Sequence, residues 1–217
     1  NKLRSSGSKD WGRSLKSACN LERLYMKNNS ISDDGGAALV DCLITLKRLR
    51  ILDLSENCLG RKCGKAIRTM LMTSVSLSHL FLRWNRFLKD DMQALGEGVS
   101  GNESLVSLDL AFNALSKCHL ILRDDASEVV DCFFNALSTH GSLRHLDLSF
   151  NDFSVDECRK FGEVLRRNVS IVGLHMDGNR GIVDNYGFLT ETEDMASIKT
   201  YEAVSYTHLR AHETRSY

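Results

Sequence analysis

The sequence has no long apolar run, no net charge and no closely paired cysteines, and each absence argues against a class of protein. None of its apolar runs approaches the roughly 20 residues that a membrane-spanning helix requires. Its 28 basic and 28 acidic side chains cancel. Because nucleic-acid binding depends on an excess of Lys and Arg, this balance argues against a nucleic-acid-binding protein. We therefore expect neither a membrane nor a nucleic acid as a partner.

The cysteines do not follow the spacing of a disulfide framework or of a thiol redox motif. They are odd in number, no two of them form a CxxC pair, and they stand at Cys19, Cys42, Cys58, Cys63, Cys118, Cys132 and Cys158. Free thiols are typical of proteins in reducing compartments. We therefore expect an intracellular, cytoplasmic protein.

Motifs of catalysis are also missing. The sequence contains neither a GxSxG nucleophile elbow nor an HExxH zinc motif. Residues 60–66 resemble a phosphate-binding loop, but the segment is one residue short and has Ala66 where Mg²⁺ binding needs a hydroxyl group. We therefore expect a protein that is not an enzyme and that binds no cofactor.

What the sequence does contain is one pattern repeated six times. Residues 105–115 read LxxLxLxxNxL, and the pattern begins at Leu21, Leu49, Leu77, Leu105, Leu143 and Ile171. Four of the five steps are 28 residues long and one is 38. Each copy predicts a short strand that buries alternate leucines, and a fixed period predicts a stack of equal units.

A pair of apolar residues four positions apart precedes each predicted strand, which indicates one inward-facing helix per unit. The pairs are Trp11 and Leu15, Leu39 and Leu43, Ile67 and Leu71, Leu95 and Val99, Phe133 and Leu137, and Phe161 and Leu165. Right-handed crossovers then align the strands in one parallel sheet. Helices are wider than strands, so we expect a curved α/β solenoid with the sheet on its concave face and the helices on its convex face.

A 28-residue unit with a full helix resembles the ribonuclease-inhibitor-like subclass of leucine-rich repeats. That subclass includes ribonuclease inhibitor, the Ran GTPase-activating protein and the sensor arms of NOD-like receptors. The resemblance covers about residues 11–188 and implies a leucine-rich-repeat horseshoe of about six repeats. It implies binding of a protein partner, because the fold serves many partners and fixes no single function.

The pattern also divides the chain. Residues 1–20 look like the end of a truncated preceding repeat, and residues 21–188 form the repeat array. The ten surplus residues of the fourth repeat, at about 117–126, predict a loop between strand and helix; we leave open whether this loop contacts a partner. Residues 189–217 look irregular, and the segment from about 203 resembles a translated adaptor or vector tail. We expect a fragment of a longer array.

Positions within the pattern predict the functional surface. The asparagine that closes each strand is expected to bond the backbone of its turn, at Asn29, Asn57, Asn85, Asn113, Asn151 and Asn179. The third, fifth and seventh positions are expected to face away from the core. With the eighth-position aromatics, they predict a partner-binding concave face and rim at Tyr25, Asp53, Phe81, Arg83, Trp84, Asp109, Phe112, His145, Asp147, Phe150 and His175.

Two features of this surface have more than one interpretation. His145, Asp147, His175 and Asp177 could ligate Zn²⁺ or act as an acid–base cluster, but a flat sheet rarely converges ligands tetrahedrally, so we favour a polar surface and no metal. The aromatic residues could seal the sheet edge or anchor a partner, and Trp84 is the best candidate for such an anchor.

Charge is distributed unevenly along the chain despite the balanced total. Residues 1–50 carry ten basic and five acidic side chains, whereas residues 101–200 carry nine basic and sixteen acidic ones. A solenoid separates its ends in space, so this gradient survives folding and either steers a partner or belongs to solvated faces. The sequence as a whole predicts a non-catalytic protein-interaction scaffold. The alternatives are a regulator of a small GTPase and the sensor arm of a larger receptor or cytoskeletal protein.

Overall fold

A single parallel sheet runs through the computed structural model, which describes residues 14–15, 18–117, 126–183 and 189–191. Its strands are adjacent in the order of the sequence, and leucines of successive repeats are in register, as in the pairing of Leu24 with Leu52. The six strands are β1 (Arg23–Tyr25), β2 (Ile51–Asp53), β3 (His79–Phe81), β4 (Ser107–Asp109), β5 (His145–Asp147) and β6 (Gly173–His175). The predicted parallel sheet with one strand per repeat is confirmed.

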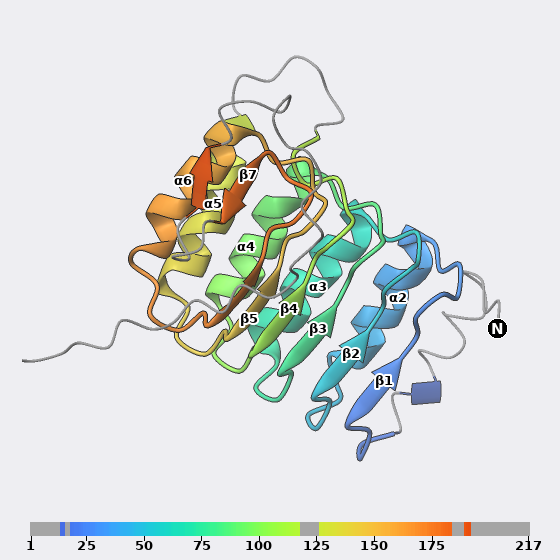
Figure 1. Cartoon of the computed structure of the whole chain (residues 1–217). Coiled ribbons are helices and arrows are strands. Elements are labelled where there is room, and N and C mark those ends of the chain that lie inside the picture. Colours follow the sequence, from blue (N-terminus) through green and yellow to red (C-terminus); the bar gives the residue numbers. More distant parts are fainter. Residues whose placement is uncertain (1–13, 16–17, 118–125, 184–188, 192–217) are drawn as a thin grey trace, which may run out of the picture.

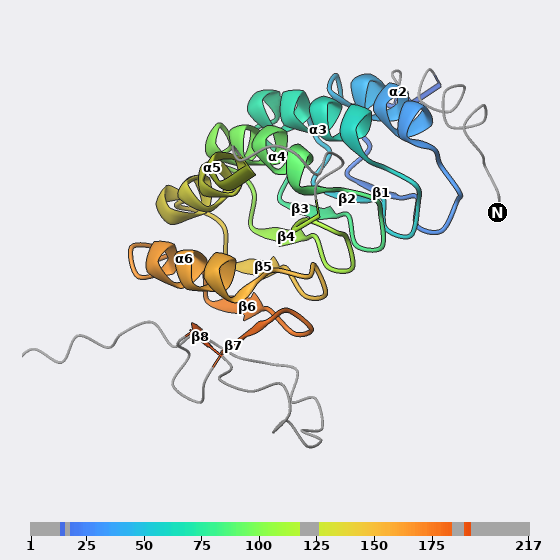
Figure 2. The ribbon, with the colours of Figure 1, turned by 90° about the horizontal axis from the view of Figure 1, so that it is seen from above.

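One helix follows each of the first five strands and lies on the outer side of the sheet. Figure 1 shows the helices as a row behind the strands, and Figure 2 shows the strands on the inside of the curve. The helices are α2 (Asp33–Leu43), α3 (Arg61–Thr73), α4 (Met92–Ser100), α5 (Ala126–Thr139) and α6 (Val155–Leu165), and a 3₁₀ turn, η1 (Lys89–Asp91), precedes α4. The predicted solenoid, with a concave sheet and convex helices, is confirmed.

The core fills the space between the sheet and the helices. Alternate strand leucines such as Leu52, Leu80 and Leu108 are buried against the apolar faces of the helices. The five helical pairs from Leu39 onward are buried in the same layer, apart from the half-buried Leu165. Leu15 packs against this layer, and its partner Trp11 lies outside the described residues. Each repeat buries its apolar face only against the neighbouring repeats, so this continuous layer stabilises the whole array.

The starts of α2 and α3 are capped by polar side chains, the second of them across the repeat boundary. Ser32 accepts a hydrogen bond from the N–H of Gly35 and caps its own helix, α2. Helix α3 begins at Arg61, and Gly60 at its N-cap position has no side chain to cap it. The carboxylate of Asp33 in the preceding repeat instead accepts from the backbone N–H groups of Gly60, Lys62 and Cys63, at 2.8–2.9 Å. The loop that resembles a phosphate-binding site is therefore filled by the protein's own carboxylate.

Beyond β6 the chain forms a different structure from the repeats. Strands β7 (Gly181–Val183) and β8 (Leu189–Glu191) pair antiparallel, and β8 lies beside α6. We expected residues 189–217 to be irregular, which is wrong for residues 189–191. The hairpin was missed because its strands are only three residues long and lack the leucine pattern of the repeats.

Several features inferred from the sequence lie outside the described residues. These are most of the truncated repeat at 1–20, residues 118–125 of the insertion predicted at about 117–126, with its apolar segment 120–122, and the tail from 192 onward, which includes the adaptor-like segment from 203. Their predicted structures stay predictions.

Candidate functional site

The asparagine column fastens the turn at the carboxyl end of every strand. Asn57 shows the full arrangement: its Oδ1 atom accepts from the N–H groups of Asn29 and Ile31, and its Nδ2 atom donates to three backbone carbonyls, at 2.9–3.2 Å. Asn85, Asn113, Asn151 and Asn179 repeat the pattern. Each side chain therefore joins its own turn to the turn of the preceding repeat, which holds the rim rigid.

A second polar ladder on the opposite rim was missed by sequence reasoning. Three residues before each strand pattern, Ser74, Asn102, His140 and Asn168 accept hydrogen bonds from the backbone that enters the strand. The hydroxyls of Ser76, Ser104, Ser142 and Ser170 donate to carbonyls of the preceding repeat. The recurring segment Asn-x-Ser followed by Leu or Ile was the signal, and it is structural: Asn102 is 3% exposed and bonded through both ends of its amide.

The eighth position of every repeat has a left-handed backbone. Its φ angles lie between 53° and 71°, at Asn28, Glu56, Trp84, Phe112, Phe150 and Gly178. Glycine and asparagine adopt this conformation readily, whereas a bulky aromatic residue does so at a cost of roughly 1–2 kcal/mol. Three consecutive repeats nevertheless place an aromatic ring here, and such strain is found where a side chain serves packing or binding.

These rings form a continuous stack, which we call the aromatic ladder (Trp84, Phe112 and Phe150). The rings of Trp84 and Phe112 are 4.3 Å apart and 9° from parallel, and those of Phe112 and Phe150 are 4.2 Å apart and 12° from parallel. Trp84 remains 50% exposed and Phe150 46%. The ladder ends at Gly178, because the ring of Phe150 fills the space that a side chain there would need. Stacking offsets part of the backbone strain and leaves an apolar edge in solvent.

Arg83 belongs to the same rim. Its guanidinium carbon lies 5.5 Å from the centre of the Phe112 ring, within the range of a cation–π contact. The Nε atom of Arg83 is buried without a hydrogen-bond partner among the described residues. Arg83 therefore extends the surface beside the aromatic ladder and adds a positive charge to it.

The fifth-position carboxylates on the concave face accept a backbone hydrogen bond and remain partly exposed to solvent. Asp53, Asp109 and Asp147 each accept from the backbone N–H of the residue two positions on, at 2.9–3.0 Å. Burial raises the pKa of Asp109 to about 6; the hydrogen bond from the N–H of Ala111 opposes this rise, and the neighbouring charge of Asp147 adds to it. These carboxylates hold the turn after each strand through this hydrogen bond, and they place negative charge on the concave face of the sheet.

That bond explains why the expectation for the seventh position is wrong in half of the repeats. Ser55, Ala111 and Ser149 are buried, at 1–5% exposed, instead of facing out. The strands end at the fifth position, so the alternation of faces stops there, and the seventh residue is drawn under the aspartate. The seventh-position side chain is exposed only at Lys27 and Asp177 and is half-buried at Arg83.

The third and fifth positions do face away from the core. Tyr25 is 59% exposed on β1, Phe81 is half-buried on β3, and His175 is half-buried on β6. The ring of His145 lies over the backbone of Gly173 on the adjacent strand. In the described part of the chain, no three His, Cys, Asp or Glu side chains are placed to hold a metal ion together. The four residues considered for zinc form a polar surface across β5 and β6.

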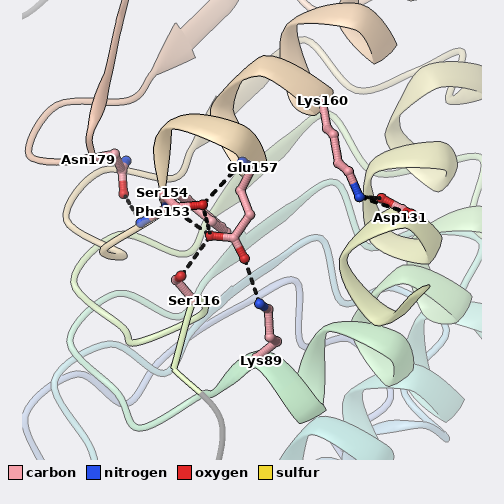
Figure 3. Close-up of polar contacts among 8 residues, drawn as sticks. All are labelled: Lys89, Ser116, Asp131, Phe153, Ser154, Glu157, Lys160 and Asn179. Carbon is pink, nitrogen blue, oxygen red and sulfur yellow. Dashed lines mark hydrogen bonds and ion pairs between the residues drawn. The ribbon is translucent and has the colours of Figure 1, made fainter. Parts of the chain in front are cut away.

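Beneath the rim, one carboxylate ties three repeats together (Figure 3). Glu157 closes the capping box with Ser154, accepts from the hydroxyl of Ser116 at 2.7 Å and pairs with Lys89 at 2.7 Å. Burial by itself raises the pKa of Glu157, but the hydrogen bonds from Lys89, Ser154 and Ser116 outweigh it and hold the pKa below its usual range. This cluster lies where the chain leaves the fourth strand toward the insertion, since Ser116 immediately precedes it.

Comparison with known proteins agrees with this geometry. A family model described as "Leucine Rich repeat" matches residues 17–40 and 142–156. The matched segments include the turn and strand elements that carry the asparagine column. The chain is built from leucine-rich repeats.

Proteins with related sequences contain the same repeats in much longer chains. The repeat array is 26% identical over 162 residues to NACHT, LRR and PYD domains-containing protein 4E of Mus musculus, covering 75% of this chain and 16% of that protein. It is 29% identical over 187 residues to Tonsoku-like protein of Bos taurus, covering 73% and 14%. NACHT, LRR and PYD domains-containing protein 3 of Homo sapiens is 28% identical over 166 residues, covering 76% and 15%. The chain thus spans about one-sixth of the relatives' length.

Solved structures share the fold. Actin-binding site 2 of leiomodin-1 superposes with a TM-score of 0.56 at 15% identity, covering 73% of this chain and 88% of that chain. The C-terminal domain of tropomodulin from Caenorhabditis elegans has the same TM-score at 16% identity, covering 76% and 92%. Within the described residues of the repeat array, no helix is both long and apolar enough to cross a bilayer.

Proposed function

We propose that the array is a non-catalytic interaction module that binds a partner protein through its concave sheet and the aromatic ladder. The observation that carries this proposal is the ladder itself: two of its three rings remain about half exposed although their backbone is strained. A soluble surface gains nothing from such rings in water, whereas a partner that covers them removes apolar area from solvent.

The rigidity of the ladder supports the same function. The rings are held by stacking, and their turns are held by the asparagine column. A preordered aromatic surface loses little conformational entropy on binding, and aromatic and arginine side chains dominate the energetics of interfaces. Trp84 and Arg83 are adjacent in sequence and on the rim, so we place the energetic centre of the interface there.

The relatives favour a second, compatible assignment, in which this array is the partner-binding arm of a larger receptor. Its sequence is 26–28% identical to repeats of several NACHT, LRR and PYD domains-containing proteins. The full-length transcript tests this assignment directly. A nucleotide-binding domain encoded in the same chain supports it, and a full-length chain of repeats alone contradicts it.

Capture of a partner from cell extract, compared between matched variants, tests the proposed surface. Trp84→Asn removes a ladder ring and keeps a residue suited to the left-handed backbone, because Asn28 has the same conformation in the first repeat. Met72→Asn on α3 removes a side chain of similar exposure, 52%, from the convex side. We expect Trp84→Asn to reduce capture at least about tenfold, the scale of a hot-spot residue, and Met72→Asn to leave it unchanged.

Two results contradict the proposal. Equal capture by Trp84→Asn and by the wild type, with both folded by circular dichroism, removes the ladder from the interface. Stimulated GTP hydrolysis in a mixture of the protein with small GTPases contradicts the non-catalytic assignment.

We also propose that the protein works in a reducing, intracellular compartment. The support is chemical: six cysteines in the described part carry free thiols, and burial raises the pKa of the Cys158 thiol to about 11, so this thiol stays protonated and unreactive at neutral pH. Titration of thiols in protein purified without reductant tests this. Full thiol content supports the assignment, and disulfide-linked peptides in a digest contradict it.

A further inference from the structure

Two carboxylates on the concave face lie next to each other without an ion-pair contact, although the charge of Arg83 is near enough to lower the pKa of Asp109. Asp109 on β4 and Asp147 on β5 are partners in the register of adjacent strands. One oxygen of each accepts the backbone N–H of its own turn, from Ala111 and Ser149. Among the described residues, no lysine or arginine forms an ion pair with either carboxylate, although nine other ion pairs are present.

The two negative charges repel each other at the short distance between neighbouring strands, about 4.8 Å. The raised pKa of Asp109 reflects this, in addition to its burial. Such a pair is destabilised until a cation binds, so a positive group from a partner gains attraction from two carboxylates at once.

Asp53 places a single carboxylate on β2, but only β4 and β5 place two fifth-position carboxylates side by side. The first strand carries the exposed cation Arg23, and the nearby Glu56 is neutralised by Lys27 at 3.0 Å. At the other end, Asp177 extends the acidic surface beyond β6, where it is exposed. The paired carboxylates make β4 and β5 the most acidic part of the concave face, so a bound segment gains most attraction with its positive residues there.

The aromatic ladder borders the same two strands. Phe112 follows Asp109 by three residues and Phe150 follows Asp147 by three, so each carboxylate shares a repeat with one ring of the stack. Flat rings beside carboxylates suit a guanidinium or ammonium group, which makes ion pairs through its N–H groups and cation–π contacts through its face. The protein's own Arg83 already makes such a contact with Phe112.

We propose that the β4–β5 part of the concave face docks a segment of the partner protein that presents an arginine or lysine over Asp109 and Asp147, next to an apolar residue on the edge of the aromatic ladder. This inference rests on the proposed function and specifies the chemistry of the partner. The occupant is a basic peptide segment, because the paired carboxylates require a cation and the exposed ring edges require apolar cover.

The test uses a charge-neutral variant that keeps the fold. Asp109→Asn with Asp147→Asn removes both charges, but each asparagine retains a side-chain oxygen that can accept the N–H of Ala111 or Ser149. The matched control, Asp131→Asn with Asp156→Asn, changes the net charge equally on the convex helices, where both carboxylates form exposed ion pairs. The probes are a short acetylated Gly-Ser peptide with arginines and one tryptophan, and the same peptide with glutamates.

Binding is measured by fluorescence anisotropy at low and at physiological salt. We expect the wild type and the control to bind the arginine peptide at least about tenfold more tightly than the glutamate peptide, and the face variant to lose that preference. The preference should weaken with added salt, because dissolved ions screen the attraction between the arginines of the peptide and carboxylates that are partly exposed to solvent. In the amide NMR spectrum of the wild type, the Ala111 and Ser149 signals should shift on addition of the arginine peptide.

Other outcomes overturn the inference. These are equal binding of the two peptides, no binding of the arginine peptide to the wild type, and an equal loss of preference in the control variant. The proposed function is judged separately with the captured partner. If the face variant captures it as well as the wild type does while Trp84→Asn loses it, the interaction module stands and the basic segment is wrong; if Trp84→Asn also retains it, the proposed interface fails.

Discussion

The ring of Phe150 lies on the backbone of Gly178, in the space that a Cβ atom would occupy. The two residues hold the same position in successive repeats, and both have a left-handed backbone, with φ angles of 54° and 71°. The repeat that ends the aromatic ladder therefore has a glycine for two physical reasons. Glycine adopts the left-handed backbone without strain, and its lack of a side chain leaves room for the Phe150 ring against the backbone.

Gly178→Ala should destabilise the array by about 2 kcal/mol, because a methyl group there is strained in the left-handed region and displaces the Phe150 ring. Urea unfolding followed by circular dichroism measures this. Gly141→Ala is the matched control, since no atom lies within 4 Å of the position of its Cβ. An unchanged midpoint for Gly178→Ala would show that the ring does not lie on this glycine.

Asn57→Ala should lower the free energy of unfolding by about 3 kcal/mol, because five backbone groups each lose a hydrogen bond in a buried turn. Asn29→Ala tests the same column at a residue whose side chain makes fewer hydrogen bonds. The Oδ1 atom of Asn29 has no partner among the described residues, and its amide makes one hydrogen bond, to the carbonyl of Lys27. Losses of equal size in the two variants, measured by chemical denaturation, would contradict the role assigned to the asparagine column.

His140→Asn should make the array less sensitive to acid. Burial lowers the pKa of His140, whose Nδ1 atom accepts from the N–H groups of Ser142 and Leu143. The unfolded chain takes up this proton near pH 6.5 and the folded chain only at lower pH, so the free energy of unfolding falls as pH drops below about 6.5. Asparagine serves the same position at Asn102 without titrating.

The measurement is the difference in unfolding free energy between wild type and His140→Asn at pH 7 and at pH 5. The difference isolates His140 from Asp109, whose raised pKa has the opposite effect and adds stability as pH falls from about 6 toward its unfolded value. We expect the variant to gain on the wild type at pH 5 relative to pH 7. A constant difference would show that His140 takes up protons equally in the folded and unfolded chain.

Glu157→Gln should destabilise the array by about 3 kcal/mol, because it leaves the charge of Lys89 largely buried and unpaired. Asp131→Asn breaks the neighbouring pair with Lys160 in Figure 3, where the side chains are 43% and 45% exposed. That change should cost less than about 1 kcal/mol. Thermal unfolding of both variants compares them, and an equal small effect would show that the Lys89 pair adds little.

The strands and helices could be predicted because each repeat must bury the same apolar face. Leu108 and Leu80 stand at the same pattern position and lie in the same layer, so period alone located them. The seventh position could not be inferred in this way. Whether Ser149 faces the core or solvent depends on where the strand ends, and the hydrogen bond from its N–H to the Asp147 side chain decides that.

The rims were less predictable than the sheet, since they depend on side-chain geometry. The aromatic column was visible in sequence, but the left-handed backbone that holds Trp84 and the contact of Phe150 with Gly178 were not. The ladder at Asn102 and Asn168 had a clear signal in the recurring segment Asn-x-Ser followed by Leu or Ile.

Site-specific photo-crosslinking tests most directly whether the partner covers the aromatic ladder. A benzophenone amino acid replaces Trp84 in one protein and Val75, which is 82% exposed away from the ladder, in another. We expect the captured partner to crosslink at position 84 and not at position 75, with the crosslinked peptide of the partner rich in basic residues. A partner that crosslinks at position 75 and not at position 84 would contradict it.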